Sequence, residues 1–74
     1  MTKQPVVNGP ECIRALQRAG FVINRQKGDH VIMKRPNSPI RVTVPNHRKD
    51  LKPGTLHQII LDAGLTVDEF IDLL

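Results

Sequence analysis

Two stretches of the chain repeat apolar residues at the spacing of one helical face. The first starts at Pro10, which suits the first turn of a helix, and stops at Gly20, which is typical of a helix C-terminus. The second runs from Pro53 to Gly64 in the same way. The apolar positions are Cys12, Ile13, Leu16 and Ala19 in the first stretch and Leu56, Ile59, Ile60 and Ala63 in the second. The pattern predicts two amphipathic helices, each with one face to bury.

The segment between them has the pattern of a three-stranded antiparallel meander. β-branched and apolar residues open the first strand, apolar and polar residues alternate in the third, and turn residues separate the strands. Turns are expected at Lys27–Asp29 and Pro36–Pro39, and Pro45 is expected to end the pairing of the last strand. The predicted strands are residues 21–25, 30–35 and 40–44.

The two ends of the chain give different signals. Residues 1–8 lack periodicity and are expected to form a loose N-terminal arm, whereas residues 9–74 are expected to form a single domain. Near the other end, Thr66 and Glu69 fit a capping box ahead of a short C-terminal helix. The predicted fold class is α+β: helix, three-stranded antiparallel meander, helix, in a two-layer sandwich with the element order of the double-stranded-RNA-binding fold.

The composition indicates which classes of partner and which cellular compartment to expect. The 74 residues carry 11 Lys and Arg against 7 Asp and Glu, and the net charge of +4 favours a polyanionic partner, either a nucleic acid or an acidic protein. Cys12, the single cysteine, lies in an apolar pattern and is expected to be a buried thiol in a reducing cytosol. Because the sequence shows no secretory signal and no long apolar stretch, we expect a cytoplasmic protein without a membrane partner.

His30 is the residue with the clearest capacity for chemistry. It follows the predicted hairpin turn, and Lys27, three residues earlier, is well placed to meet a phosphate. An unperturbed imidazole has a pKa of about 6.5 and exchanges protons near neutral pH. The alternative is a surface histidine that only flanks a turn. His57 lies off the apolar face of the second helix and is expected to be a solvated residue without a role.

Four segments, in the right order and spacing, carry a resemblance to a known family. They are Gly20-Phe21, Arg25-Gln26-Lys27-Gly28-Asp29-His30, Val42-Thr43-Val44-Pro45-Asn46-His47 and Leu51-Lys52-Pro53-Gly54-Thr55-Leu56. Together they resemble the HicA toxins of bacterial and archaeal toxin-antitoxin pairs, from about Ile13 to Leu65. The resemblance implies a small RNA-cleaving toxin with a double-stranded-RNA-binding-like fold. It also implies that His30 is catalytic and that a HicB-type antitoxin masks the activity.

One residue departs from the family pattern. The position between Gly28 and His30 usually holds a small hydroxyl residue in these toxins, whereas this chain has Asp29. A carboxylate there would favour the imidazolium and repel a phosphate, unless Lys27 or a neighbouring arginine neutralises it. Alternatively, Asp29 caps the hairpin turn through its own backbone and points away.

RNA cleavage requires few catalytic groups, which a protein of this size is able to provide. The 2′-hydroxyl of the ribose is the nucleophile, so a base, an acid and cations that stabilise the charge on the phosphorane are sufficient, with no metal and no small-molecule cofactor. His30 would be the principal general base or acid. His47 either contacts RNA, acts as the second proton-transfer group, or bonds only to the backbone of its loop.

The basic residues of the loop before the second helix are the preferred RNA contacts. Arg48, Lys49 and Lys52 lead into a helix N-terminus, whose free backbone N–H groups add to the attraction for phosphate. The alternative is an ordinary solvated loop. Lys27 and Gly28 are expected to meet RNA at the hairpin.

Lys34 shares strand parity with His30. It is expected either to support the site, if that face of the sheet is open, or to protect a sheet edge against aggregation. Three other arginines are expected only to keep exposed faces soluble: Arg14, Arg18 and Arg41.

Three functions fit the sequence. The first is a type II toxin, a metal-independent endoribonuclease (mRNA interferase) that cleaves mRNA with His30 and is neutralised by a HicB-type antitoxin. The second is a non-catalytic module for double-stranded or structured RNA, which needs only the fold and the charge. The third is an interaction protein whose positive charge meets an acidic partner. Because Phe21 and Phe70 are expected in the core, base stacking on single strands is disfavoured in each case.

Overall fold

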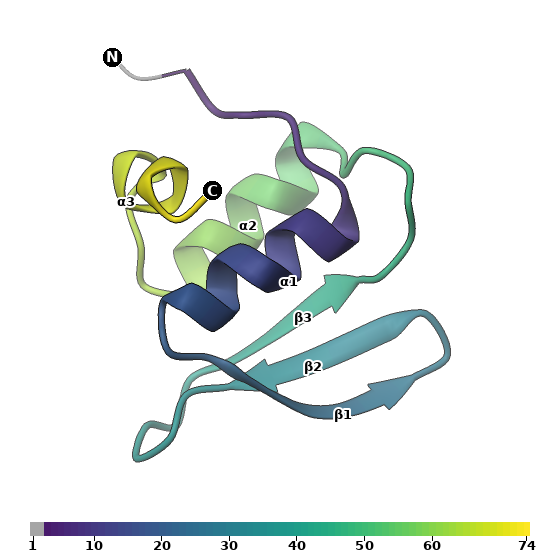
Figure 1. Cartoon of the computed structure of the whole chain (residues 1–74), viewed down its shortest axis with the longest axis vertical. Coiled ribbons are helices and arrows are strands. Elements are labelled where there is room, and N and C mark those ends of the chain that lie inside the picture. Colours follow the sequence, from purple (N-terminus) through teal and green to yellow (C-terminus); the bar gives the residue numbers. More distant parts are fainter. Residues whose placement is uncertain (1–2) are drawn as a thin grey trace.

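The structure, a computed structural model, describes residues 3–74 as three helices and one antiparallel sheet (Figure 1). The elements are α1 (Gly9–Arg18), β1 (Val22–Lys27), β2 (His30–Lys34), β3 (Arg41–Pro45), α2 (Pro53–Asp62) and α3 (Val67–Asp72). Their order confirms the α+β prediction of helix, three-stranded meander, helix and short C-terminal helix. In Figure 1, α1 and α2 lie side by side over the sheet, and α3 lies on the other side of these two helices.

Local signals set the ends of the helices. The side chain of Asn8 accepts a hydrogen bond from the Glu11 backbone N–H and the Glu11 carboxylate accepts one from the Asn8 N–H, so α1 begins at Gly9, before the predicted Pro10. Thr66 and Glu69 form the predicted capping box of α3. Gly20 and Gly64 follow α1 and α2 with φ of 97° and 74°, a conformation that glycine adopts without strain.

The register of the sheet divides its residues between two faces. The strand order is β1-β2-β3, and cross-strand partners share a face while successive residues alternate. One face of β2 and β3 is buried under the helices through Val31, Met33, Val42 and Val44. The opposite face carries His30, Ile32 and Lys34 of β2 and Arg41, Thr43 and Pro45 of β3. All six residues of β1 are exposed, because α1 and α2 pack mainly against β3 at the other edge of the sheet.

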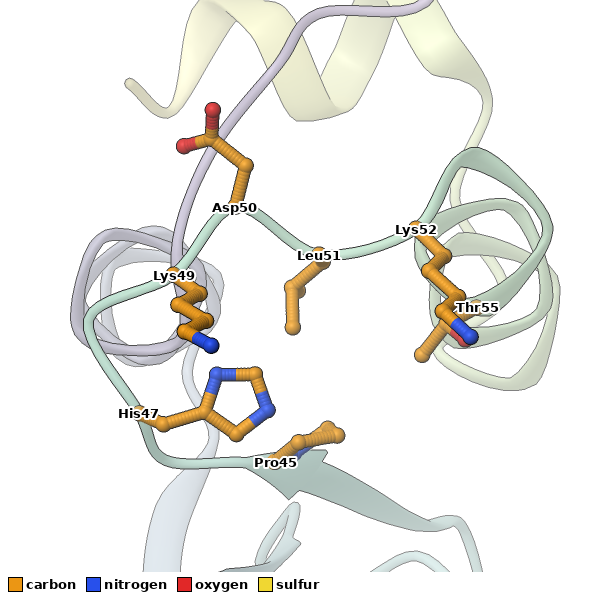
Figure 2. A pocket seen from close by; sticks show the side chains of 7 residues that line it. All are labelled: Pro45, His47, Lys49, Asp50, Leu51, Lys52 and Thr55. Atoms are coloured by element: carbon orange, nitrogen blue, oxygen red, sulfur yellow. The ribbon is translucent and has the colours of Figure 1, made fainter.

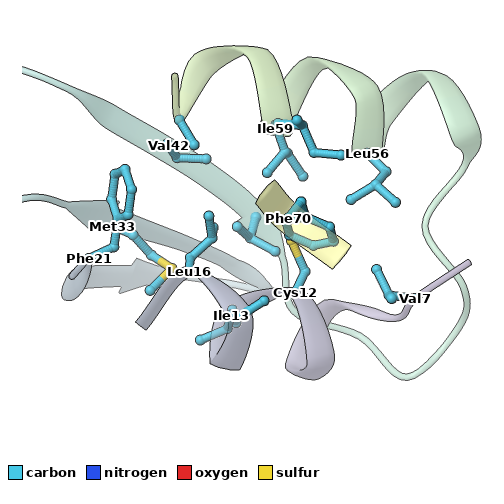
Figure 3. Packing of buried hydrophobic residues seen from close by; sticks show 14 of the residues in the cluster. Val7, Cys12, Ile13, Leu16, Phe21, Met33, Val42, Leu56, Ile59 and Phe70 are labelled. Atoms are coloured by element: carbon cyan, nitrogen blue, oxygen red, sulfur yellow. The ribbon is translucent and has the colours of Figure 1, made fainter. Parts of the chain in front are cut away.

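A single apolar core lies between the sheet and the helices (Figure 3). Phe21 and Phe70 are 1% and 0% exposed, which confirms that both aromatic side chains belong to the core. Phe70 comes from α3, so the short C-terminal helix closes the side of the core that the sheet leaves open. Burying each large side chain of this kind contributes about 1.5–3 kcal/mol before conformational entropy is subtracted. Arg18 holds α3 in place from α1 by donating to the Leu73 carbonyl at 2.7 Å.

The segment before α1 is attached to the domain from Gln4 onward, which differs from the expected loose arm. Val7 is 3% exposed and belongs to the core, and its carbonyl accepts a hydrogen bond from the Leu51 N–H at 2.9 Å. Asn8 and Asp50 form an isolated β-bridge beside it. The sequence did not indicate this attachment, because only one apolar residue of the segment, Val7, reaches the core and the segment has no periodic pattern.

Gly9 lies where the start of α1 touches the loop after β3. Its N–H donates to the His47 carbonyl at 3.1 Å. A Cβ added at this position would stand 2.1 Å from the Pro45 oxygen and 2.9 Å from the Asn46 Cα, both backbone atoms. The close approach of these two segments therefore requires glycine.

We predict that Gly9→Ala lowers the free energy of unfolding by about 1–3 kcal/mol, because the added methyl group forces α1 and the loop apart. Urea unfolding followed by circular dichroism measures the change. The matched control is Gly54→Ala in the first turn of α2, where no atom lies within 4 Å of the added Cβ. This control is expected to be neutral or slightly stabilising, by up to about 1 kcal/mol. Equal destabilisation of the two variants would contradict the close-contact explanation.

Cys12 makes the stability depend on alkaline pH. The thiol is fully buried, and this burial raises its pKa from 9.0 to about 12. The unfolded chain therefore loses the thiol proton from pH 9 upward while the folded chain keeps it, so the free energy of unfolding falls between pH 9 and pH 12. We predict a fall of up to about 1.4 kcal/mol per pH unit from this group. The difference between the pH profiles of wild type and Cys12→Ala isolates it, and identical slopes would refute the assignment.

Candidate functional site

The histidine expected to act as a catalyst lies at the start of β2, directly after a tight turn. Gly28 has a φ of 60°, which lets the chain reverse between β1 and β2. The Gln26 side-chain amide donates to the Gly28 carbonyl at 3.1 Å and braces the turn. The side chain of His30 is 59% exposed, so its imidazole is open to a docked molecule.

Two charged groups flank this imidazole. Lys27 is the cross-strand partner of His30, which places both residues on the uncovered face of the sheet with their Cα atoms about 5 Å apart. Asp29, beside His30 in the turn, has its Oδ1 3.8 Å from the His30 Nδ1. That separation is too long for a hydrogen bond, and both side chains are more than half exposed, so the carboxylate acts on the ring through weak electrostatics only. The cation expected beside His30 is therefore present, and so is the carboxylate.

The pairing of β3 continues further than the sequence indicates. Pro45 was expected to end it, but Pro45 is the last residue of β3 and lies opposite His30. The next residue, Asn46, donates its N–H to the Asp29 carbonyl at 2.5 Å. Proline is tolerated here because β3 is an edge strand. The result is that the loop after β3 is fastened to the hairpin turn beside His30.

A pocket of about 410 Å³ opens beyond Pro45, between the end of β3 and the start of α2 (Figure 2). Its lining residues are Pro45, His47, Lys49, Asp50, Leu51, Lys52 and Thr55. Figure 2 shows the His47 ring and the Lys49 ammonium group pointing into the space, with Lys52 on the α2 side. The helix adds to the positive character, because the N-cap residue Lys52 makes no capping hydrogen bond and the first turn of α2 contains no acidic residue.

The structure thus brings together some of the residues that were predicted to contact RNA. His47, Lys49 and Lys52 line one pocket, and this pocket shares Pro45 with the surroundings of His30. Arg48 is exposed in the same loop but is not among the lining residues. Lys34 lies four residues along β2 from His30, a separation of about 13 Å, on the same face of the sheet. His57 is exposed on α2 outside this region, as expected of a solvated residue.

Two arginines that sequence reasoning left out share that face. Arg25 and Arg41 are both exposed and are on the side of the sheet away from the helices. Strand parity with Lys34 gives the side of Arg41, and parity with Lys27 gives the side of Arg25, because the bulge in β1 lies between Ile23 and Arg25 and shifts only the residues before it. Arg35 is different. Its guanidinium donates to the Ala19 carbonyl at 2.6 Å and lies 5.2 Å from the centre of the Phe21 ring, so it serves the fold.

Residues 3–74 contain no group of three or more His, Cys, Asp or Glu side chains placed to hold a metal ion. Within the same residues, no helix has the length and apolar character needed to cross a membrane.

Comparison with known proteins gives the family of the chain. The family model described as the HicA toxin of bacterial toxin-antitoxin matches residues 9–65 of the 74-residue chain. The chain therefore belongs to the HicA toxin family, and its role is that of a toxin. A comparison with curated proteins gave no match.

The carboxylate beside His30 leads to a prediction about anion binding. We expect Asp29→Asn to bind a heparin column more tightly and to elute at a higher salt concentration, because it removes the one negative charge at the hairpin. The control is Asp72→Asn on α3, which changes the net charge equally but lies in the helix away from the sheet. Equal shifts in the two variants would show that only net charge matters.

Proposed function

We propose that the protein is a metal-independent endoribonuclease that cleaves mRNA, with His30 as general acid and base, and that a HicB-type antitoxin neutralises it. The observation that carries the proposal is the exposed imidazole of His30, paired across the strands with Lys27 and next to a cationic pocket. Membership of the HicA toxin family also supports the proposal.

The proposed reaction uses the nucleophile that RNA itself carries. His30 accepts the proton of a ribose 2′-hydroxyl, whose oxygen attacks the adjacent phosphorus, and the bond from phosphorus to the 5′-oxygen of the next nucleotide breaks. His30 then donates the proton that it has accepted to the leaving 5′-oxygen, and the products are a 2′,3′-cyclic phosphate and a free 5′-hydroxyl. Lys27 stabilises the additional negative charge that develops on the phosphoryl oxygens during this step.

The pocket beyond Pro45 is proposed to hold the RNA on one side of the scissile bond. Its two ammonium groups, from Lys49 and Lys52, suit a neighbouring phosphate, and the His47 ring offers hydrogen bonds or a stacking surface to the nucleotide. Gly28 leaves the hairpin without a side chain, which lets the backbone approach the RNA closely. Arg48 adds charge to the outside of the same loop.

An exposed site of this kind needs a partner to silence it. His30 and the pocket are linked through Pro45, which pairs with His30 and lines the pocket, and through the hydrogen bond from the Asn46 N–H to the Asp29 carbonyl. A HicB-type antitoxin that covers His30 and the pocket would exclude RNA without unfolding the toxin. A non-catalytic module for structured RNA would present the same charges, so the test has to separate binding from cleavage.

We predict that His30→Ala abolishes RNA cleavage, with a loss of about 10²–10⁴-fold or more, while RNA binding and folding persist. The side chain is exposed, so its removal changes the free energy of unfolding by no more than about 0.5 kcal/mol. Cleavage of a labelled transcript, in buffer with a metal chelator, measures the effect. The control is His57→Ala, which is expected to cleave like the wild type.

The chemical groups at the ends of the RNA fragments provide a second test. A 2′,3′-cyclic phosphate on the upstream fragment would identify the 2′-hydroxyl as the nucleophile. Cleavage that survives in His30→Ala, or that requires added magnesium, would overturn the catalytic role of His30. RNA binding by the wild type without any cleavage would favour the non-catalytic module instead.

A further inference from the structure

We infer that the uncovered face of the sheet binds a single strand of RNA through its phosphates, with Arg25, Lys34 and Arg41 as the contacts. The inference rests on the proposed ribonuclease function and extends it: the substrate would run from the His30 hairpin across the sheet, away from the pocket at α2. Arg25 and Arg41 have no other assignment, and the sequence left them as a strand residue and a solubilising residue.

The register places these cations in rows on one face. At the hairpin, Lys27, His30 and Pro45 are cross-strand neighbours. The next row on that face is Arg25, Ile32 and Thr43, and the row after it is Val22, Lys34 and Arg41. Neighbouring strands are about 4.8 Å apart and alternate residues of a strand about 6.6 Å apart. The cations therefore extend about 13 Å from the level of His30, enough to meet the phosphates of a few nucleotides.

Beyond the hairpin, the charged side chains of this face are all positive. From residue 22 to residue 45 the chain has five basic residues and one acidic residue, Asp29, which lies in the turn. The other acidic residues, Glu11, Asp50, Asp62, Asp68, Glu69 and Asp72, belong to the helices or to the loop before α2. Within residues 3–74, none of the three proposed contacts forms an ion pair with a carboxylate, and none of their side chains bonds to the backbone of the fold as Arg35 does.

Several features favour RNA over a protein partner on this face. A protein interface is usually centred on aromatic or large apolar side chains. Here the middle row offers one half-buried isoleucine, Ile32, beside a threonine and an arginine, and both phenylalanines are in the core. The only large apolar side chain exposed on the face is Val22, at its far edge, 43% exposed. The face is also continuous with the residues around His30, which an RNA substrate has to reach.

Phosphate contacts carry no sequence information, and this has a functional consequence. Without aromatic residues on the face, successive bases have no ring on which to stack. The sheet would therefore raise affinity for any RNA strand and leave sequence preference to the region around His30 and the pocket. Affinity should depend steeply on salt, because each phosphate contact releases bound counterions.

The test measures RNA binding in a protein that does not cut, the full-length His30→Ala variant. The probe is a fluorescent single-stranded RNA of roughly 12 nucleotides, titrated at several salt concentrations. Adding Arg25→Gln and Arg41→Gln should weaken binding about tenfold at low salt and reduce the slope of log affinity against log salt by about 1.4, as expected for two lost phosphate contacts on a single strand.

The matched control adds Lys3→Gln and Arg14→Gln to the same background. It lowers the net charge equally, but both residues lie outside the sheet. We expect a loss of less than about threefold and little change in slope, because distant charges act only through the screened overall field. Circular dichroism confirms that each variant folds. In a protein that still has His30, the Arg25→Gln, Arg41→Gln pair should raise KM and leave kcat unchanged.

Each result is decisive for the sheet face. Equal weakening in the two pairs of variants would overturn the inference, because only net charge would then matter. No weakening in the Arg25→Gln, Arg41→Gln protein would overturn it as well. So would the loss of antitoxin binding with RNA affinity intact, which would assign the face to a protein partner. Since binding is measured without cleavage, failure of the ribonuclease proposal leaves a distinct signature: the sheet variants weaken RNA binding, while the wild type binds RNA and does not cut it.

Discussion

The end of the molecule that carries His30 depends on two backbone hydrogen bonds that fasten one loop on both sides. The loop after β3 receives a hydrogen bond from the Gly9 N–H at the His47 carbonyl, and it donates one from the Asn46 N–H to the Asp29 carbonyl. One of these joins the loop to the first helix and the other joins it to the hairpin that carries His30. A loop held at two successive residues loses most of its freedom, so the pocket and the imidazole keep a fixed relation although both are exposed to solvent. The absence of a Cβ at position 9 is what lets the first of these contacts form.

Much of the fold could be predicted from the sequence, because its signals are local. Gly20 and Gly64 adopt the positive φ that their place after a helix indicates, and the capping box at Thr66 forms as its residues suggest. Apolar periodicity identified the buried faces of both long helices, including Cys12. The predictions that failed concern residues whose position depends on a contact with a distant part of the chain. Val7 becomes part of the core through its pairing with the segment before α2, and nothing in residues 1–8 alone could show that.

The candidate site divides in the same way. The exposure of His30 and the neighbouring Lys27 follow from the hairpin, which short-range turn signals specify. The grouping of His47 with two lysines does not follow from the sequence, since it requires the loop to fold back toward α2. The side of Arg25 follows from Lys27 by strand alternation. A bulge between Ile23 and Arg25 then puts Val22, rather than Ile23, on the same face as Arg25, which alternation along the sequence does not indicate.

The division of labour between the two faces of the sheet explains how so small a chain combines stability with an open surface. All the large buried side chains lie between the sheet and the helices, and no charged side chain within residues 3–74 is buried. A domain of this size has little stability to lose, because a small chain buries a smaller share of its surface than a large one. Placing the His30 imidazole and the neighbouring cations on the uncovered face keeps their desolvation out of the folding free energy. Within residues 3–74 the His30 side chain is 59% exposed, so this surface is open to a second molecule. A partner that bound this preformed surface would need little ordering of the toxin itself.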